Sequence, residues 1–172
     1  KLLPLIALPL LFRRLGVVQT LRYSGIAIAT FLVSFLPLLD PHLWQILVSV
    51  ALYFHSFSFN ASIFYMVKWA LNTVSGTDLT AFAGYGMAIV TFGGVLYYAF
   101  REKNAATPNK TNLNAFMLGL LFVWSLYLAC ATTIHPWYVA PLVAWSVFTP
   151  YRFPLLWSLL VMGSYAAYNK QP

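Results

Sequence analysis

Residues 113–134 read LNAFMLGLLFVWSLYLACATTI, an unbroken apolar run without a charged side chain. At 1.5 Å of rise per residue, a helix of this length measures about 33 Å, enough to cross the roughly 30 Å hydrocarbon core of a bilayer. A strand of an outer-membrane barrel would instead alternate apolar and polar residues over a shorter stretch. The run therefore predicts a membrane-spanning α-helix.

The composition of the whole chain agrees with this prediction. Of its 172 residues, 61% are hydrophobic, 18% are aromatic and 8% are charged, and the mean hydropathy is +0.76. Water cannot solvate such a chain as a compact globule. We therefore expect an all-α, polytopic membrane protein with a single transmembrane helical domain over residues 1–172. Because the chain opens on Lys1 without a signal-peptide pattern, we also expect it to be a fragment of a longer protein.

Several apolar runs are candidates for membrane segments. The first run and the last two are short for a span of ~20 residues, so we expect about five to six membrane segments in all. The runs are 2–12, 23–39, 79–100, 113–134, 138–148 and 155–168.

The net charge of +7 comes from short basic clusters between these runs. Membrane topology explains dispersed clusters better than nucleic-acid binding does, because cytoplasmic loops carry an excess of Lys and Arg. We therefore expect no nucleic-acid partner, and we expect the basic loops to face the cytoplasm. Arg13, Arg14 and Arg22 flank one such loop, Arg101, Lys103 and Lys110 another, and Arg152 lies in a third.

Residues 40–78 are then expected at the outer face. The apolar run Leu43–Phe54 has only about half the length needed to cross, so it should lie in the interface. Asn60 is a favourable N-cap for an interfacial helix from Ala61 to about Leu71, and Gly76 is a plausible stop for the helical pattern. This predicts an interfacial helix with two unlike faces. The apolar stripe holds Ile63, Val67, Ala70 and Val74, and the other stripe holds Tyr65, Lys68, Trp69 and Asn72.

Polar and aromatic side chains gather at two places that border this outer face. Residues 53–69 mix aromatic, hydroxyl and amide groups, and an apolar run ends in residues 132–138. Polar groups at membrane depth are costly and often mark functional sites. The predicted substrate-binding residues are Tyr65, Lys68, His55, Asn60, His135, Trp137 and Tyr138.

Each of these residues also has a structural interpretation. Lys68 is a candidate ligand of a phosphate, or a lysine that snorkels toward lipid headgroups. Trp137 and Tyr138 are candidates for stacking on a ligand, or for anchoring in the interface. His55 and His135 could instead cap helix ends.

The remaining motifs predict packing more than chemistry. Four glycines in one run, Gly84, Gly86, Gly93 and Gly94, predict a close helix contact, because small residues let backbones approach in lipid. The sequence has no metal-ligand spacing and no phosphate-binding glycine loop. We expect no metal site and no cofactor, with a divalent cation left open.

A family resemblance depends on the two polar segments. Residues 53–65 (YFHSFSFNASIFY) and 132–138 (TTIHPWY), followed by Tyr151-Arg152-Phe153-Pro154, resemble bacterial polyprenol-phosphate-dependent mannosyltransferase-like proteins of the multi-spanning GT-C superfamily. Members of that superfamily are longer and place a catalytic aspartate in the first external loop. The resemblance therefore implies the carboxyl-terminal part of such a protein, multi-pass in the bacterial cytoplasmic (inner) membrane, with the acidic catalytic residue outside this chain.

The implied chemistry is transfer of a mannose-like sugar from a polyprenyl-phosphate donor at the outer membrane face. Lys68 would stabilise the departing phosphate, and His135 would donate a hydrogen bond. Trp137 or Tyr138 would stack on the sugar or the polyprenyl chain. The alternative is a non-catalytic accessory subunit that packs against other membrane subunits, which glycine-rich and aromatic faces would serve equally well.

Overall fold

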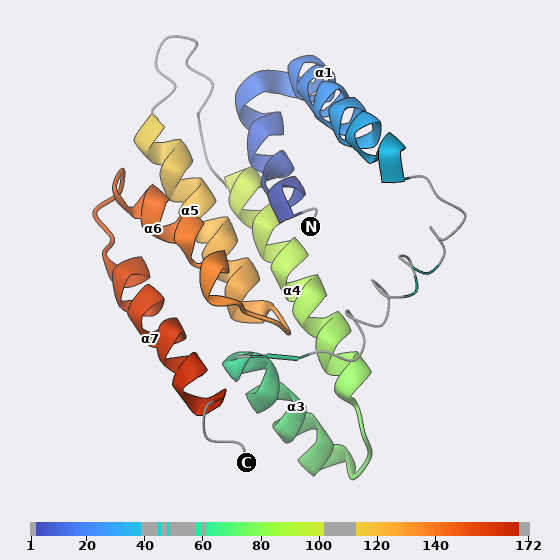
Figure 1. Cartoon of the computed structure of the whole chain (residues 1–172), viewed down its shortest axis with the longest axis vertical. Coiled ribbons are helices and arrows are strands. Elements are labelled where there is room, and N and C mark those ends of the chain that lie inside the picture. The colour runs from blue at the N-terminus through green and yellow to red at the C-terminus, as the bar shows by residue number, and fades with distance from the viewer. Residues whose placement is uncertain are drawn as a thin grey trace.

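The computed structural model in Figure 1 describes residues 3–38, 45, 48, 58–59, 61–101 and 113–168. Within these residues the chain is helical, and its only β contact is an isolated bridge between Phe59 and Thr133. The all-α prediction is thus confirmed for the described part. The elements are η1 (Leu3–Ala7), α1 (Leu8–Phe35), η2 (Leu36–Leu38), α3 (Ser62–Ser75), α4 (Thr80–Arg101), α5 (Leu113–Cys130), η3 (Pro136–Tyr138), α6 (Ala140–Ser146) and α7 (Phe153–Tyr168).

Three helices of the described residues are long and apolar enough to cross a membrane: the Arg14–Phe35 part of α1, all of α4, and α5. The predicted run 79–100 corresponds to α4, and the predicted run 113–134 begins where α5 begins. The run 138–148 contains only the seven-residue α6, which rises about 10 Å and is too short to span the bilayer alone. The described helices thus provide three candidate spans of the five to six expected.

Helix α1 changes direction at Gly16. This glycine has φ 76° and ψ 166°, a conformation essentially restricted to residues without a Cβ atom. The prediction of a loop between Arg14 and Arg22 is therefore wrong, because the helix continues on both sides of a single non-helical residue. In Figure 1 the first part of α1 lies beside α4, whereas the second part diverges from the other helices.

Helices α4 and α5 approach closely at Gly94. A Cβ atom at this position would overlap the Leu126 side chain of α5, so the predicted close helix contact is confirmed here. The contact continues where Val95 of α4 packs in one apolar cluster with Val123 of α5. The other three glycines do not contribute to it, because an added Cβ atom would meet nothing within 4 Å at Gly84, Gly86 or Gly93.

Replacing Gly94 with valine is expected to lower the free energy of unfolding by roughly 1–3 kcal/mol, the usual cost of overpacking. The adjacent Gly93→Val variant is the matched control, because it makes the same chemical change on the exposed side of α4. Unfolding of both variants in detergent measures the difference. An equal loss of stability in both would contradict the packing described for Gly94.

Helix α3 packs against the first turns of α4 at one end of the molecule (Figure 1). Its buried Phe64 contacts Ala83 and Met87 of α4. The helix begins at Ser62, and Ala61 occupies the N-cap position that was predicted for Asn60. The predicted stop is confirmed, since Gly76 follows the last helical residue in the left-handed conformation, with φ 67°.

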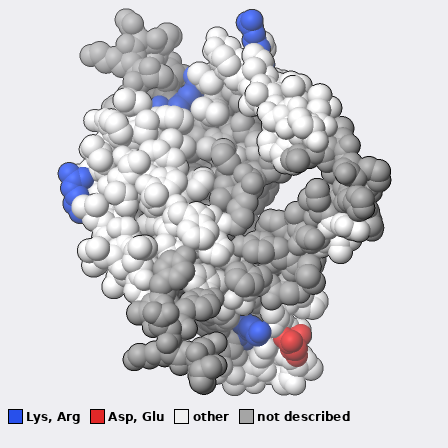
Figure 2. Space-filling model, viewed as in Figure 1, with Lys and Arg blue, Asp and Glu red and all other residues white. Residues whose placement is uncertain are grey.

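Basic side chains lie at the end of the helices opposite α3. Arg14 stacks over the ring of Phe116 near the start of α5, with 5.0 Å between the guanidinium carbon and the ring centroid. Arg101 ends α4 and lies 5.7 Å from the ring centroid of Tyr97. Figure 2 shows basic groups at this end, and a neighbouring acidic and basic group at the α3 end.

The turn between α6 and α7 is closed by Arg152. Its Nη1 donates hydrogen bonds to the carbonyl oxygens of Ser146, at 2.7 Å, and Thr149, at 2.9 Å. Ser146 is the last residue of α6 and Thr149 lies just beyond it, so the cation also complements the dipole at this helix end. Arg152 is thus a structural residue of the turn in which the sequence places it.

Candidate functional site

The two polar segments of the sequence meet beside α3. Helix α5 ends at Cys130, earlier than the predicted Ile134, because the chain becomes extended there and pairs with residue 59. The Phe59 N–H donates to the Thr132 carbonyl at 3.0 Å, and the Ile134 N–H donates to the Phe59 carbonyl at 2.8 Å. These two backbone bonds join the approach to α3 to the segment that follows α5.

An aromatic cluster forms around His135 at this junction. The imidazole is stacked on the Trp137 indole, with 4.5 Å between centroids and 8° between planes. It also meets the Tyr138 ring edge-on at 5.2 Å and the Phe59 ring at 5.7 Å. Tyr138 is buried, whereas Trp137 is 59% exposed. The aromatic cluster, meaning Phe59, His135, Trp137 and Tyr138, therefore offers an exposed indole that is stacked on a half-buried imidazole, with the buried Tyr138 ring against that imidazole.

The local backbone explains how the cluster forms. Pro136 fixes the start of η3, and the Tyr138 N–H donates to the His135 carbonyl at 2.9 Å across this tight turn. The Tyr138 carbonyl accepts a hydrogen bond from the indole Nε1 of Trp124 at 2.9 Å. Trp124 is not among the site residues predicted from the sequence. Its signal was an indole N–H inside a spanning run, which needs a partner because lipid offers none.

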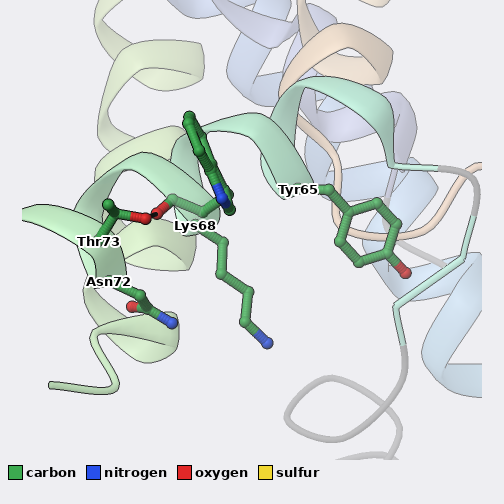
Figure 3. Close-up of a pocket in the computed structure, with 5 residues that line it drawn as sticks. Tyr65, Lys68, Asn72 and Thr73 are labelled. Atoms are coloured by element: carbon green, nitrogen blue, oxygen red, sulfur yellow. Dashed lines mark hydrogen bonds between the residues drawn. The ribbon is translucent and has the colours of Figure 1, made fainter. Parts of the chain in front are cut away.

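Lys68 and Tyr65 lie on α3, where they line an open depression of about 400 Å³. Figure 3 shows the Lys68 side chain extended away from α3, with Tyr65 one turn earlier on the same helix. The Tyr65 hydroxyl donates to the Ser58 carbonyl and contacts the Ser58 hydroxyl, both at 3.0 Å, which ties α3 to the residue before Phe59. The depression is lined entirely from α3, by Tyr65, Lys68, Trp69, Asn72 and Thr73.

The predicted site residues are thus distributed over two surfaces. His135, Trp137 and Tyr138 come together in the aromatic cluster, and Tyr65 and Lys68 share the depression on α3. Ser58 and Phe59 connect the two, because Ser58 bonds to Tyr65 and Phe59 contacts His135. The cluster does not line the depression itself. His55 and Asn60 lie outside the described residues.

Asp78 is the only carboxylate among the described residues, and it caps the start of α4. Its Oδ1 accepts hydrogen bonds from the Thr80 hydroxyl and, at 3.0 Å, from the Thr80 N–H. These bonds lower the pKa of Asp78, with smaller contributions from Asn72 and the positive charge of Lys68. A carboxylate with a lowered pKa is a weak general base at neutral pH, so Asp78 is a capping residue.

No three His, Cys, Asp or Glu side chains of the described ranges gather as metal ligands would. In comparisons with known proteins, no family model matches the chain, and neither curated proteins nor solved structures give a match. A function must therefore be inferred from the aromatic cluster, the depression on α3 and the resemblance stated above.

Proposed function

We propose that this chain belongs to a multi-pass glycosyltransferase of the GT-C superfamily, which uses a polyprenyl-phosphate donor of a mannose-like sugar at the outer face of the bacterial cytoplasmic membrane. The observation that carries the proposal is the pairing of Phe59 with Thr133. It joins the two sequence segments that carry the resemblance, although they are far apart in the chain. Segments that act on one ligand must meet in this way.

The surface of α3 supports a position in the membrane interface. At about 100° per residue, four of its exposed apolar side chains form one stripe, and Lys68 and Asn72 lie on the opposite side. A helix with such faces lies in the interface plane with its apolar side in the acyl region. Val74, at 90% exposure, shows how little of this stripe is used for packing within the chain. The exposed stripe consists of Ile63, Met66, Ala70 and Val74, whereas Val67 of the predicted stripe is half-buried and packs in the cluster around Phe64.

The charge distribution supports the outer face as the location of transfer. Arg14 and Arg101 lie at the end opposite α3, and the positive-inside rule assigns that end to the cytoplasm. Helix α3 and the aromatic cluster are then external. In this arrangement the second part of α1, α4 and α5 cross the bilayer, and the shorter apolar segments complete five to six membrane segments.

The residues of both surfaces suit the two parts of a lipid-linked sugar. The exposed Trp137 indole, held flat against His135, is suited to stacking on the apolar face of a sugar or on an isoprene unit. Lys68 supplies a positive charge for the phosphate that departs in the reaction. Asp78 is engaged in capping, so we assign the general base to an acidic residue outside the described part of the chain.

A binding experiment tests this proposal. The natural protein, purified in detergent, is titrated with a short polyprenyl phosphate and with the polyprenol of the same length, and tryptophan fluorescence is followed. We expect the phosphate to bind roughly tenfold or more tightly, because a charge-assisted contact is worth ~1.5–3 kcal/mol. Equal affinities for the phosphate and the alcohol would overturn the phosphate-binding role.

An accessory membrane subunit is the second candidate, and the exposed helix faces favour it. In the candidate span of α1 only 6% of the residues are buried, and Gly86 and Gly93 of α4 are exposed, as in helices that receive a partner. Copurification of the natural protein with other membrane subunits in fixed proportion, together with failure to bind polyprenyl phosphate, would favour this function over the transferase.

A further inference from the structure

Trp124 connects the middle of α5 to the turn that carries the aromatic cluster. Its side chain is buried, and its Nε1 donates to the Tyr138 carbonyl oxygen at 2.9 Å. Its ring meets the Trp145 ring of α6 edge-on, with 5.5 Å between centroids and 84° between planes. A single side chain thus holds both η3 and α6 against α5.

This contact leads directly to the exposed indole of Trp137. The Tyr138 carbonyl accepts from Trp124, and the Tyr138 N–H donates to the His135 carbonyl at 2.9 Å. His135 in turn is stacked on Trp137. A hydrogen bond at membrane depth is not exchanged for one to water, and leaving its buried donor unpaired is costly. The bond from Trp124 therefore fixes the turn at residues 136–138 against α5, because lipid offers the indole N–H no other acceptor.

We propose that Trp124 is a positioning residue, which holds the His135–Trp137 stack in its binding geometry before a ligand arrives. A preordered stack binds more tightly, because the ligand does not have to order the side chains on arrival. The identity of the ligand rests on the proposed function. The ordering of the stack does not.

The variant Trp124→Phe tests this role, because it removes the indole N–H and keeps most of the ring. The matched control is Trp157→Phe on α7, which makes the same change to a half-buried side chain packed against the same apolar cluster. The readout is acrylamide quenching of Trp137, obtained as the difference between each protein and the same protein carrying Trp137→Phe. Thermal unfolding of both variants is measured in parallel.

In Trp124→Phe we expect the quenching constant of Trp137 to rise about twofold, with no rise in Trp157→Phe. Affinity for a polyprenyl phosphate should fall about fivefold, as for the loss of one hydrogen bond. Unchanged quenching in a folded Trp124→Phe protein would reduce Trp124 to a packing residue and overturn the proposal. If Trp124→Phe does not fold, Trp124→His is the second variant, because it keeps a ring N–H. We then expect the quenching constant of Trp137 to equal that of the wild type. A twofold rise in Trp124→His would contradict the proposal.

The two proposals fail in different ways. If the wild-type protein does not bind polyprenyl phosphate, the proposed function fails, while the quenching of Trp137 still decides the role of Trp124.

Discussion

Replacing Phe64 with alanine is expected to release α3 from α4 and to lower the free energy of unfolding by about 3–5 kcal/mol, the usual cost for a buried phenylalanine. Phe64 is 4% exposed and packs against Ala83 and Met87. Ala83 is too small to fill the space that the ring leaves, so a cavity should remain. Unfolding of the purified natural protein in detergent, with limited proteolysis near α3, measures the change.

Trp69→Ala is the control for this variant. It removes an aromatic ring from the same helix, but Trp69 is 71% exposed and lines the open depression. We expect a change of less than about 0.5 kcal/mol, as for exposed positions in general. A loss as large as that of Phe64→Ala would mean that α3 packs through a different face.

Release of α3 should also disturb the geometry of the aromatic cluster. The Tyr65 hydroxyl binds Ser58, and the neighbouring Phe59 pairs with Thr133 and contacts His135. Movement of α3 would therefore strain the junction between the two polar segments. Reduced donor binding in Phe64→Ala, at a temperature where the other helices are intact, would reveal this coupling.

The spanning helices could be predicted because length and hydropathy are local properties of the chain. Both α4 and the start of α5 lie where the apolar runs 79–100 and 113–134 predict them. The end of α5 could not be predicted in this way, because it is set by pairing with Phe59 from another part of the chain. The sequence predicts a loop between the apolar runs 2–12 and 23–39, and the change of direction at one residue, Gly16, could not be predicted, since a positive φ at a glycine has no distinct sequence signal.

The candidate site was predicted in part. Residues 135–138 could be identified because a histidine, a proline and two aromatic residues end an apolar run, and their mutual contact follows from the short turn. The indole N–H of Trp124 inside a spanning run indicated a need for a partner, but the partner could not be predicted, because it lies in a turn outside α5. The sequence also could not predict which glycine of α4 contacts α5. Gly93 and Gly94 are adjacent, and only their positions around the helix axis decide which of them faces α5.

Replacing Lys68 with methionine is expected to reduce kcat/KM for the lipid-linked donor roughly ten- to a hundredfold, through loss of a charge-assisted contact worth ~1.5–3 kcal/mol. Methionine preserves the length and apolar stem of the side chain and removes the charge. Because Lys68 lines an open depression and does not fill a packed core, the variant should unfold at the same temperature as the wild type. A transfer assay with the natural protein and its acceptor measures the effect.

Lys68→Arg is the matched control, since it retains the positive charge and should retain most of the activity. His135→Ala should reduce donor use in the same direction as Lys68→Met, because it removes the ring on which Trp137 is stacked. If Lys68→Met transfers sugar as well as the wild type does, the lysine is a headgroup anchor, and the phosphate must be bound by another cation. If Lys68→Met and Lys68→Arg lose activity equally, side-chain shape and not charge is decisive, which the proposed stabilisation of the departing phosphate does not allow.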